Sequence, residues 1–430
     1  MTAPLPRSVE HVDLDAATRP VRPPAMVVAW RGGAPVAVRD VEPGDDPAAL
    51  GAWLDGLRAT TPPSAPAVSS LGVSVVVPTV VGRVDEIRAL LSSLDGLRHG
   101  PLEVILVDNR RSVPEDDPLP ALVAGHPRVR VVRQPVPGIS AARNAGAAAA
   151  RYPVVAFTDD DVQVDPSWAG ALAARFEREP DLRAVTGLIL PAELETPAQI
   201  WFEEHYGGFS GERTFAPVTL RPVARGGRRR RRARIEVVDA RGVVQRSFAL
   251  YGVGAYGAGA SMAFRREALL GAGAFDEALG TGTPARGGED LAALVGVLWA
   301  GGSIGYEPSA VVHHTHRREV AQLHHQLRGN GIGFTAMLTS LVLRDPRHLA
   351  GIGLQVPLAV VRLAQQSAAR LSRRAQPAGG STRARTAPRS LVVAELSNFA
   401  LGPFAYLRSR RTRPTGTPAE RSTTPTEARR

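Results

Sequence analysis

Short apolar runs alternate with amphipathic segments between residues 73 and 158. The apolar runs are residues 73–78, 102–107, 129–133 and 154–158. They are almost continuously apolar, which is typical of strands that are buried on both faces. The segments between them have helical spacing and are residues 85–97, 118–124 and 140–151, the last of which we expect Ser140 to cap. This alternation predicts an α/β domain with a parallel sheet and right-handed crossovers.

The pattern changes on both sides of this region. Before it, residues 25–38 predict a hairpin that turns at Gly32 and Gly33, residues 47–57 predict a helix, and residues 60–66 resemble a linker. After residue 201 it is irregular, with an arginine-rich insertion at 225–234 that we expect to be an exposed loop, and a helix is predicted again at 291–300. We therefore divide the chain into an N-terminal region of unknown role (1–70), the α/β domain (71–325), a helical extension (326–372) and a basic low-complexity tail (373–430).

Composition narrows the class of protein. With 430 residues and 44% hydrophobic content, the chain is long enough to bury at least one full core. It has no cysteine, which excludes disulfides, thiolate metal sites and cysteine nucleophiles. Residues 1–20 lack the apolar core of a signal peptide, and the best apolar stretch, 349–364, is interrupted by Gln355, Pro357 and Arg362. We therefore expect a cytoplasmic protein without a membrane-spanning helix.

The net charge of +11 is concentrated near the C-terminus. Residues 341–430 contain 16 Arg and 4 acidic residues, and every basic residue of the chain is Arg, which indicates a compositional bias. A solvated tail explains this charge, and so does contact with the anionic inner face of the plasma membrane. Residues 398–413 join aromatic side chains to four Arg, which suits a membrane interface, or else the aromatic rings pack on the main domain. Nucleic acid is not an expected partner.

Polar residues follow three of the four predicted strands. The first strand ends at Pro78 and Thr79, the second at Asp108 and Asn109, and the fourth at the three consecutive aspartates 159–161. Because ligands of parallel sheets bind beyond the carboxyl ends of the strands, we expect these residues to line one crevice. Such a crevice is able to hold a nucleotide and a cation.

The aspartate cluster is the sharpest of these signals. Neighbouring carboxylates repel one another, so they stay ionised only with a cation, a hydrogen-bond donor or water nearby. In an extended segment Asp159 and Asp161 point to the same side, which suits one of them to a divalent ion and the other to a ribose or a bound water. A solvated acidic turn is the alternative interpretation. Asp108 is placed to accept hydrogen bonds from a base or a ribose, or it simply opens a turn.

Further candidates lie at two helix N-termini and in a histidine cluster. Arg143 lies one turn inside the helix that follows residues 137–139, where it could face a phosphate or be an ordinary surface residue. Glu289 and Asp290 stand between a glycine-rich loop and a helix, as caps or as a general base. Three histidines lie within residues 313–316, and His314 and His316 share a side of an extended segment, where imidazole could bind a metal ion.

The segment from about residue 73 to residue 318 resembles the inverting glycosyltransferases of family 2, particularly their actinobacterial members. The resemblance rests on an ordered set of motifs: VSVVVPT, EVILVDN, PGISAARNAG, FTDDDV, GAGASMAFRREAL, GAFDEALGTGTPARGGEDL and EPSAVVHHTHRR. It implies the GT-A fold, a doubly wound, mostly parallel α/β sheet with helices on both faces.

The resemblance also implies roles for individual residues. On the donor side are Pro78, Thr79, Asp108 (which would contact the base), Arg143 and Asp159. The metal-binding residues would be Asp159 and Asp161, which form the family's Asp-x-Asp motif with Asp161 as the direct ligand, and His314, with His316 in reserve. Asp290 would be the general base, and Glu289 would orient the acceptor or its loop.

Together these roles imply transfer of a hexosyl group from a nucleotide-sugar to an acceptor hydroxyl, with inversion and with Mn²⁺ or Mg²⁺ as cofactor. The acceptor would be a glycan, a lipid-linked molecule or a small molecule, as in assembly of a cell-envelope polysaccharide. The arginine run 228–232 departs from the family pattern, which leaves the acceptor open. Two other interpretations stay open: a nucleotidyltransferase that makes nucleotide-sugars, and a non-catalytic, membrane-associated scaffold of polysaccharide assembly.

Overall fold

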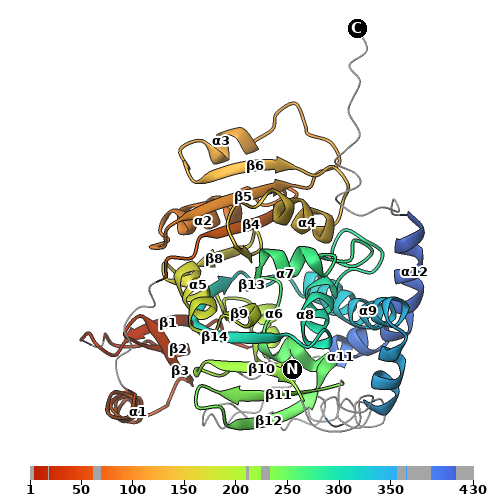
Figure 1. Ribbon diagram of the computed structural model, residues 1–430. Coiled ribbons are helices and arrows are strands. Elements are labelled where there is room, and N and C mark those ends of the chain that lie inside the picture. The colour runs from red at the N-terminus through yellow and green to blue at the C-terminus, as the bar shows by residue number, and fades with distance from the viewer. Residues whose placement is uncertain are drawn as a thin grey trace.

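The computed structural model describes residues 4–17, 19–61, 69–209, 213–223, 233–355, 365 and 389–412, which contain one small and one large β-sheet. The strands of the large sheet, in hydrogen-bonding order, are β12 (Val244–Ala249), β11 (Arg234–Asp239), β10 (Val218–Pro222), β14 (Ser303–His314), β9 (Leu182–Pro191), β13 (Met262–Arg265), β7 (Val154–Phe157), β4 (Val73–Thr79), β5 (Leu102–Asp108) and β6 (Val129–Arg133), and β8 (Val162–Val164) pairs with β14. In Figure 1 this sheet runs from β6 at the top to β12 at the bottom.

The four strands predicted from the apolar runs form the upper part of the sheet. They are β4, β5, β6 and β7, and they are parallel to one another, as expected. Further along, β13 is antiparallel to both of its neighbours, β7 and β9, while β9 and β14 are parallel. The strands β10, β11 and β12 complete the sheet as an antiparallel meander.

Helices cover the sheet and follow its strands in sequence. They are α2 (Val84–Asp95), α3 (Leu119–Val123), α4 (Ile139–Ala149), α5 (Trp168–Arg178), α6 (Pro197–Tyr206), α7 (Arg266–Gly271), α8 (Glu289–Trp299), α9 (Val320–Arg344), α11 (Arg389–Leu396) and α12 (Gly402–Thr412), with 3₁₀ turns η1 (Leu250–Tyr256) and η2 (Phe399–Leu401). The helices α9 and α12 lie side by side at the right of Figure 1.

Alternate residues of the parallel strands enter two different cores. Val75 and Val77 of β4 belong to the core that contains α2 and α5, whereas Val76 belongs to the core that contains α4 and α8. Because helices cover both faces, both sets of alternate positions are buried, and this explains why the strands are apolar at nearly every residue. The α/β class and the doubly wound sheet with helices on both faces are therefore confirmed.

Some element boundaries differ from those expected. Ser140 does not cap α4, because the helix already begins at Ile139 after Gly138, and the buried Ser140 hydroxyl donates to the carbonyl of Leu279 at 2.8 Å. The helix α8 begins at Glu289 instead of residue 291. The domain boundary drawn at residue 325 falls inside α9, so the α/β domain and the helical extension share one continuous helix.

The N-terminal residues form a small unit that packs on the large sheet. It contains β1 (Ser8–Asp13), β2 (Ala25–Arg31), β3 (Ala34–Val41) and α1 (Pro47–Thr60). The expected hairpin is present, because β2 and β3 are antiparallel and the turn residues Gly32 and Gly33 both have positive φ. Val28 of β2 packs against Leu188 of β9 and Val311 of β14. The N-terminal unit therefore shares a hydrophobic core with the strands β9 and β14 of the large sheet.

The described C-terminal residues fold back onto α9. The Thr335 hydroxyl donates to the carbonyl of Phe399, and the Tyr406 hydroxyl donates to Asp276 Oδ2 at 2.8 Å. By length and composition residues 390–412 could cross a membrane, although in this structure they are divided between α11, η2 and α12. Most of the arginine-rich insertion 225–234 and of the basic tail 373–430 lies outside the described residues.

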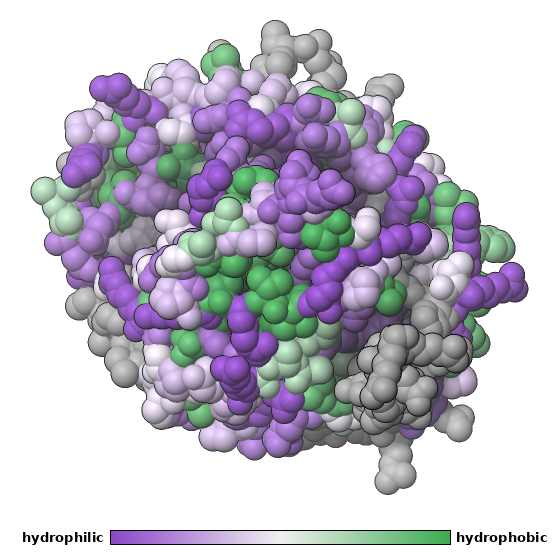
Figure 2. Space-filling model, turned by 90° about the horizontal axis from the view of Figure 1, so that it is seen from above, coloured by the Kyte–Doolittle hydropathy of each residue, from purple (hydrophilic) through white to green (hydrophobic). Residues whose placement is uncertain are grey.

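Figure 2 looks onto the top of Figure 1, at the β6 edge of the large sheet. The surface on this side is largely hydrophilic, with hydrophobic areas toward the centre. The edge strand carries Arg130 and Arg133, and Arg130 Nε donates to Glu103 Oε2 at 2.9 Å. Charged side chains on an edge strand hinder pairing with a strand of another chain.

Two glycine-to-alanine substitutions test the packing of α4 on the sheet. A Cβ at Gly146 would lie 2.3 Å from Val76 Cγ1, whereas a Cβ at Gly296 of α8 would meet no described heavy atom within 4 Å beyond its own helix. We expect Gly146→Ala to destabilise the fold by about 1–2 kcal/mol, because overpacking outweighs the gain in helix propensity. Gly296→Ala should instead stabilise it by up to about 1 kcal/mol. Urea unfolding measures both, and a shift of the same sign in both variants would contradict this packing.

Candidate active site

The residues at the strand ends meet at one edge of the sheet, as expected. Pro78 and Thr79 are the last residues of β4, and Thr79 Oγ1 donates to Asp160 Oδ2 at 2.7 Å. Thr79 also pairs in register with Asp108, the last residue of β5. The aspartates 159–161 follow β7 after a single residue, Thr158, and the pairing of β7 with β4 brings them to the same edge.

Three of the predicted metal-binding residues come together. Ligand atoms of Asp159, Asp161 and His314 all lie within 4.8 Å of one another, and His314 Nε2 is 3.3 Å from Asp161 Oδ1. Two backbone features cause this: β8 pairs with β14 so that His314 lies opposite Val162, and the Thr315 N–H donates to the carbonyl of Asp161 at 3.0 Å. The strand pairing therefore holds the imidazole beside the carboxylates.

The protonation states of this group suit a cation. Burial lowers the pKa of His314 to about 4, so its imidazole is neutral and keeps a lone pair. Burial alone would raise the pKa of Asp161, but His314, Arg83 and Arg317 together hold it below its usual value. Burial, partly offset by Arg143, raises the pKa of Asp159 to about 6. Near neutral pH the group thus offers two carboxylates and one neutral imidazole.

Two arginines contact the same aspartate cluster. One directly precedes α2, and the other follows the end of β14. Arg83 donates from Nη1 to Asp161 Oδ2 at 2.6 Å and from Nη2 to Asp160 Oδ1 at 2.7 Å. Arg317 Nη1 lies 3.4 Å from Asp161 Oδ2. Both side chains are about one-third exposed, so they reach the carboxylates from the solvent side.

Arg143 has a different position from the one predicted. Its side chain is only 1% exposed, and its guanidinium lies between Asp159 Oδ1 at 3.0 Å and Glu289 Oε1 at 2.8 Å. A Cβ on Gly259 would lie 2.5 Å from Arg143 Nη2, so the absence of a side chain there makes room for the guanidinium. Arg143 therefore acts from beneath the site, as a buried bridge between β7 and α8.

The two acidic residues that begin α8 have different surroundings. Glu289 is buried beside Arg143, and burial and Asp290 raise its pKa above the usual value while Arg143 opposes the rise. Asp290 is half-buried, and its Oδ2 accepts a hydrogen bond from the Gly259 N–H at 2.8 Å. The charge of Asp290 acts on both Arg143 and Asp159, which places it beside the metal-binding group.

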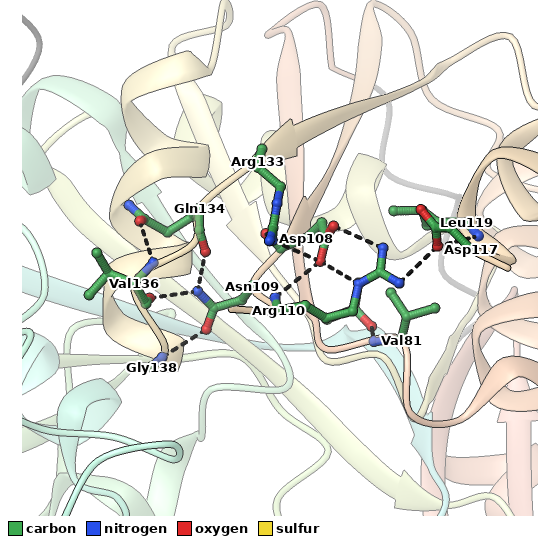
Figure 3. A network of polar contacts seen from close by, with 11 residues as sticks. Val81, Asp108, Asn109, Arg110, Asp117, Leu119, Arg133, Gln134, Val136 and Gly138 are labelled. Carbon is green, nitrogen blue, oxygen red and sulfur yellow. Dashed lines mark hydrogen bonds and ion pairs between the residues drawn. The ribbon is translucent and has the colours of Figure 1, made fainter. Parts of the chain in front are cut away.

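Asp108 is engaged within the chain. Figure 3 shows Arg110 donating from Nε to Asp108 Oδ1 and from Nη2 to Oδ2, both at 2.9 Å, while Arg110 Nη1 donates to Asp117. Arg133 Nη1 lies 3.3 Å from Asp108 Oδ1. Burial alone would raise the pKa of Asp108, but the hydrogen bonds and charge of Arg110 lower it, so the carboxylate is ionised.

The neighbouring Asn109 joins this strand end to the start of α4. Its amide donates to the carbonyls of Gln134 and Val136, and its Oδ1 accepts from the Gly138 N–H at 2.8 Å, as Figure 3 shows. Asn109 therefore shapes the turn before α4 through two donated hydrogen bonds and one accepted hydrogen bond of its side-chain amide.

The other histidines of the cluster lie outside the group of three. His316 Nε2 lies 2.7 Å from Glu203 Oε1, and its Nδ1 lies 3.3 Å from Nδ1 of His314. The ring of His313 contacts His11 of the N-terminal unit, with centroids 5.1 Å apart. On one side of His314, His316 thus contacts α6, and on the other side His313 contacts β1.

A cavity of about 840 Å³ opens beside the carboxylates. Its lining includes Arg83, Thr283, Arg286, Arg317, Gln326 and Asn330. The lining combines cationic, amide and hydroxyl groups from the loop before α8 and from one side of α9. This cavity is able to hold a polar molecule beside Arg83 and Arg317, the two arginines that contact Asp161.

Several residues of the site were missed by sequence reasoning. Arg83, Arg110 and Glu203 were not identified as site residues from the sequence. A hint was present for Arg110, which follows the strand end Asp108–Asn109 directly. For Glu203 the sequence holds no such signal, because it is 113 residues from its partner His316.

Comparisons with known proteins bear on this site. Two curated relatives, each described as pre-mycofactocin glycosyltransferase, come from Mycobacterium tuberculosis strains CDC 1551 / Oshkosh and ATCC 25618 / H37Rv. Each is 30% identical over 263 residues, which cover 60% of this chain but only 45% of the relative.

Two solved structures are similar at lower identity. One is a mannosyltransferase from Pyrobaculum calidifontis in complex with GDP-Man and Mn²⁺, with 17% identity, a TM-score of 0.45, and 84% of this chain and 93% of that chain covered. The other is GalNAc-T7 with UDP, GalNAc and Mn²⁺, with 15% identity, a TM-score of 0.41, and 63% of this chain and 51% of that chain covered.

The family comparison agrees with the position of the site. Residues 74–269 match the model of glycosyl transferase family 2, and this segment contains β4, β5 and the aspartates 159–161. The part of the chain that carries the candidate site is therefore similar to glycosyl transferase family 2.

Proposed function

We propose that this protein transfers a hexosyl group from a nucleotide-sugar to an acceptor hydroxyl, with inversion. The observation that carries the proposal is the meeting of Asp159, Asp161 and His314 beside Asp290, within a family 2 glycosyltransferase domain. The names of both curated relatives describe glycosyltransferases, which supports the same reaction class.

The three residues fit a divalent cation. Carboxylate oxygens and a neutral imidazole are ligands that Mn²⁺ accepts, and Mg²⁺ accepts the carboxylates. Ligand atoms within 4.8 Å of one another can reach a single ion. When bound, such an ion would offset the charge of the leaving diphosphate. Asp161 and His314 are the most buried of the three and would hold it, with Asp159 beside them.

The chain's own groups supply the rest of the chemistry. Asp290 would take the proton of the acceptor hydroxyl, since its carboxylate is half-exposed and the Gly259 N–H fixes its orientation. Glu289 is buried against Arg143 and would orient Asp290 through the start of α8. Arg83 and Arg317 are the cations nearest to the solvent side and would stabilise the diphosphate. A single displacement then inverts the anomeric centre.

On the donor side, Pro78, Thr79 and Asp108 would face the nucleotide. Both oxygens of Asp108 accept from Arg110 in this structure, so a base that bound this carboxylate would have to displace the guanidinium. The acceptor would enter the cavity lined by Thr283, Arg286 and Asn330, whose polar groups suit a glycan or another hydroxyl-rich molecule.

Two other functions are distinguished by product analysis. A nucleotidyltransferase would form a nucleotide-sugar from a sugar phosphate, and a non-catalytic scaffold would bind without turnover. The presence of an accessible carboxylate beside the metal-binding group favours catalysis of glycosyl transfer over both.

We also propose peripheral contact with an anionic membrane at the inner face of the plasma membrane. Leu401, directly before α12, and Phe404 and Leu407 of α12 are exposed, Phe404 by 73%. Arg408, Arg410 and Arg411 follow on the same helix and are exposed as well. Aromatic and aliphatic groups beside cations are typical of segments that bind at the lipid interface.

Replacement of a metal-binding carboxylate tests the reaction class. We expect Asp161→Asn to abolish the Mn²⁺-dependent part of nucleoside diphosphate binding, because a hard anionic ligand is lost from a small ligand set. Calorimetry with UDP and GDP, each with and without Mn²⁺, measures this. Asp239→Asn, at an exposed turn between β11 and β12, is the matched control. Equal Mn²⁺ dependence in the two variants would refute the assignment of Asp161.

The role of Asp290 has its own test. We expect Asp290→Asn to bind the donor normally and to lose transfer by roughly 10²-fold or more, the usual scale for loss of a general base. Single-turnover kinetics with the accepted nucleotide-sugar measure the loss, and the anomeric configuration of the product reports on inversion. Near-normal transfer would exclude Asp290 as the base, and a retained configuration would exclude single displacement.

Vesicle flotation tests the membrane contact. We expect the protein to float with phosphatidylglycerol vesicles at low salt, since each Arg near an anionic surface contributes about 1 kcal/mol. The double variant Phe404→Ser and Leu407→Ser should not float with the vesicles. Val393→Ser, which changes an exposed residue of α11, should still float. Absence of flotation for the unmodified protein would reject membrane binding.

A further inference from the structure

Three buried or nearly buried side chains, Arg213, Glu203 and His316, form a continuous row that ends at His314 and Asp161 of the proposed metal-binding group. Arg213 Nη2 lies 2.6 Å from Glu203 Oε2, and Glu203 Oε1 lies 2.7 Å from His316 Nε2. His316 Nδ1 lies 3.3 Å from His314 Nδ1, and His314 Nε2 faces Asp161 Oδ1 at 3.3 Å. The side chains of Glu203, His316 and His314 are between 1% and 6% exposed, so water has little access to the row.

Glu203 sets the direction of the hydrogen bonds along this row. A carboxylate only accepts, and Glu203 has Arg213 on one oxygen and His316 on the other. His316 therefore carries a proton on Nε2, and in the tautomer that has no proton on Nδ1 it presents a lone pair there. The contact between the two Nδ1 atoms is then a hydrogen bond only if His314 carries its proton on Nδ1. This leaves the lone pair of His314 on Nε2.

That lone pair points at a second acceptor. His314 Nε2 and Asp161 Oδ1 are 3.3 Å apart, and in this tautomer neither atom has a proton to donate. Two such atoms repel each other unless a cation binds both of them. The arrangement therefore prepares a cation site, and it does so through residues that are themselves remote from the cation.

The surrounding packing holds both rings in place. Phe202 lies edge-on to His316 with centroids 5.0 Å apart, and Phe209 lies 4.5 Å from the ring of His314. Gly208 has a φ of +60°, and a Cβ there would lie 2.3 Å from Glu203 Oε1. Gln199 Nε2 donates to the backbone carbonyl of His316 at 3.3 Å. The helix α6 and the turn after it thus fix Glu203 and His316 together.

We propose that Glu203 is a positioning residue which, through His316, holds His314 in the tautomer that presents Nε2 to the divalent cation. Arg213 keeps Glu203 ionised. The inference rests on the proposed metal-dependent function and assigns His316 to the hydrogen-bonded support of the site in place of direct metal binding. Removal of a group that orients a metal-binding histidine typically weakens metal affinity by about 10- to 100-fold.

The test is the affinity for Mn²⁺ alone, measured from free Mn²⁺ by electron paramagnetic resonance. We expect Glu203→Gln to bind Mn²⁺ about 10- to 100-fold more weakly than the unmodified protein. Glu204→Gln is the matched control, because it is the same change on the same helix but its side chain faces Arg7. Equal affinities in both variants would overturn the role of Glu203.

Two substitutions of His316 separate support from direct binding, and they decide the question if Glu203→Gln does not fold. His316→Gln keeps one amide donor for Glu203 and one acceptor for His314, so we expect Mn²⁺ affinity to stay within about threefold of the unmodified protein, whereas His316→Leu should lose about as much as Glu203→Gln. Equal losses in the Gln and Leu variants would make His316 a direct ligand and overturn the proposal.

The tautomers can be observed without metal. Nitrogen spectra of ¹⁵N-histidine-labelled protein should show His314 protonated at Nδ1 and His316 at Nε2, and the reverse pattern would overturn the inference. His314→Ala should lose Mn²⁺ binding in any case. If the unmodified protein binds no Mn²⁺, the metal-dependent function is wrong and this inference falls with it. If it binds Mn²⁺ and Glu203→Gln binds equally well, only the inference fails.

Discussion

The site depends on the compensation of carboxylates that the fold removes from water. A buried ionised carboxylate without a partner costs several kcal/mol, so each one needs a cation close by. Arg143 serves both Asp159 and Glu289, and Arg83 serves Asp160 and Asp161. These pairs also join the elements, because Arg143 of α4 connects the end of β7 to the start of α8. The same contacts thus hold the fold together at the edge where a substrate would bind.

The parallel half of the sheet could be predicted because strands that are buried on both faces have nearly continuous apolar runs in the sequence. Every residue of β4 is buried, and its alternate side chains enter two cores, so the run is apolar at most of its positions. The antiparallel direction of β13 could not be predicted in this way, since the residue pattern of a four-residue strand does not depend on the direction in which the strand runs. The prediction that Ser140 caps α4 was wrong because its hydroxyl donates to a carbonyl 139 residues away.

The candidate site follows the same rule. Residues at or shortly after strand ends, such as Asp108 and Asp161, were predictable because topology alone carries them to one edge of the sheet. Side chains that reach the site through tertiary packing were not. Glu203 comes from α6, and Arg143 was predicted to face a phosphate although it lies buried beneath Asp159. Sequence spacing describes which residues share a face of one element, but it does not describe which faces meet.

Arg7 ties the N-terminal unit to the rest of the molecule. Its side chain is 2% exposed and forms ion pairs with Asp40 and Glu42 of the unit and with Glu204 of α6, at 2.8 to 3.1 Å. Beside it, Val28 seals Leu188, Leu190 and Val311 from solvent. If the N-terminal unit separated from the sheet, Glu204 would lose its ion pair with Arg7. An apolar surface next to α6, the helix that carries Glu203, would also become exposed to water. We therefore expect the unit and the sheet to unfold in one cooperative transition, in which case a ligand that stabilises the site would also protect the N-terminal amides from hydrogen exchange.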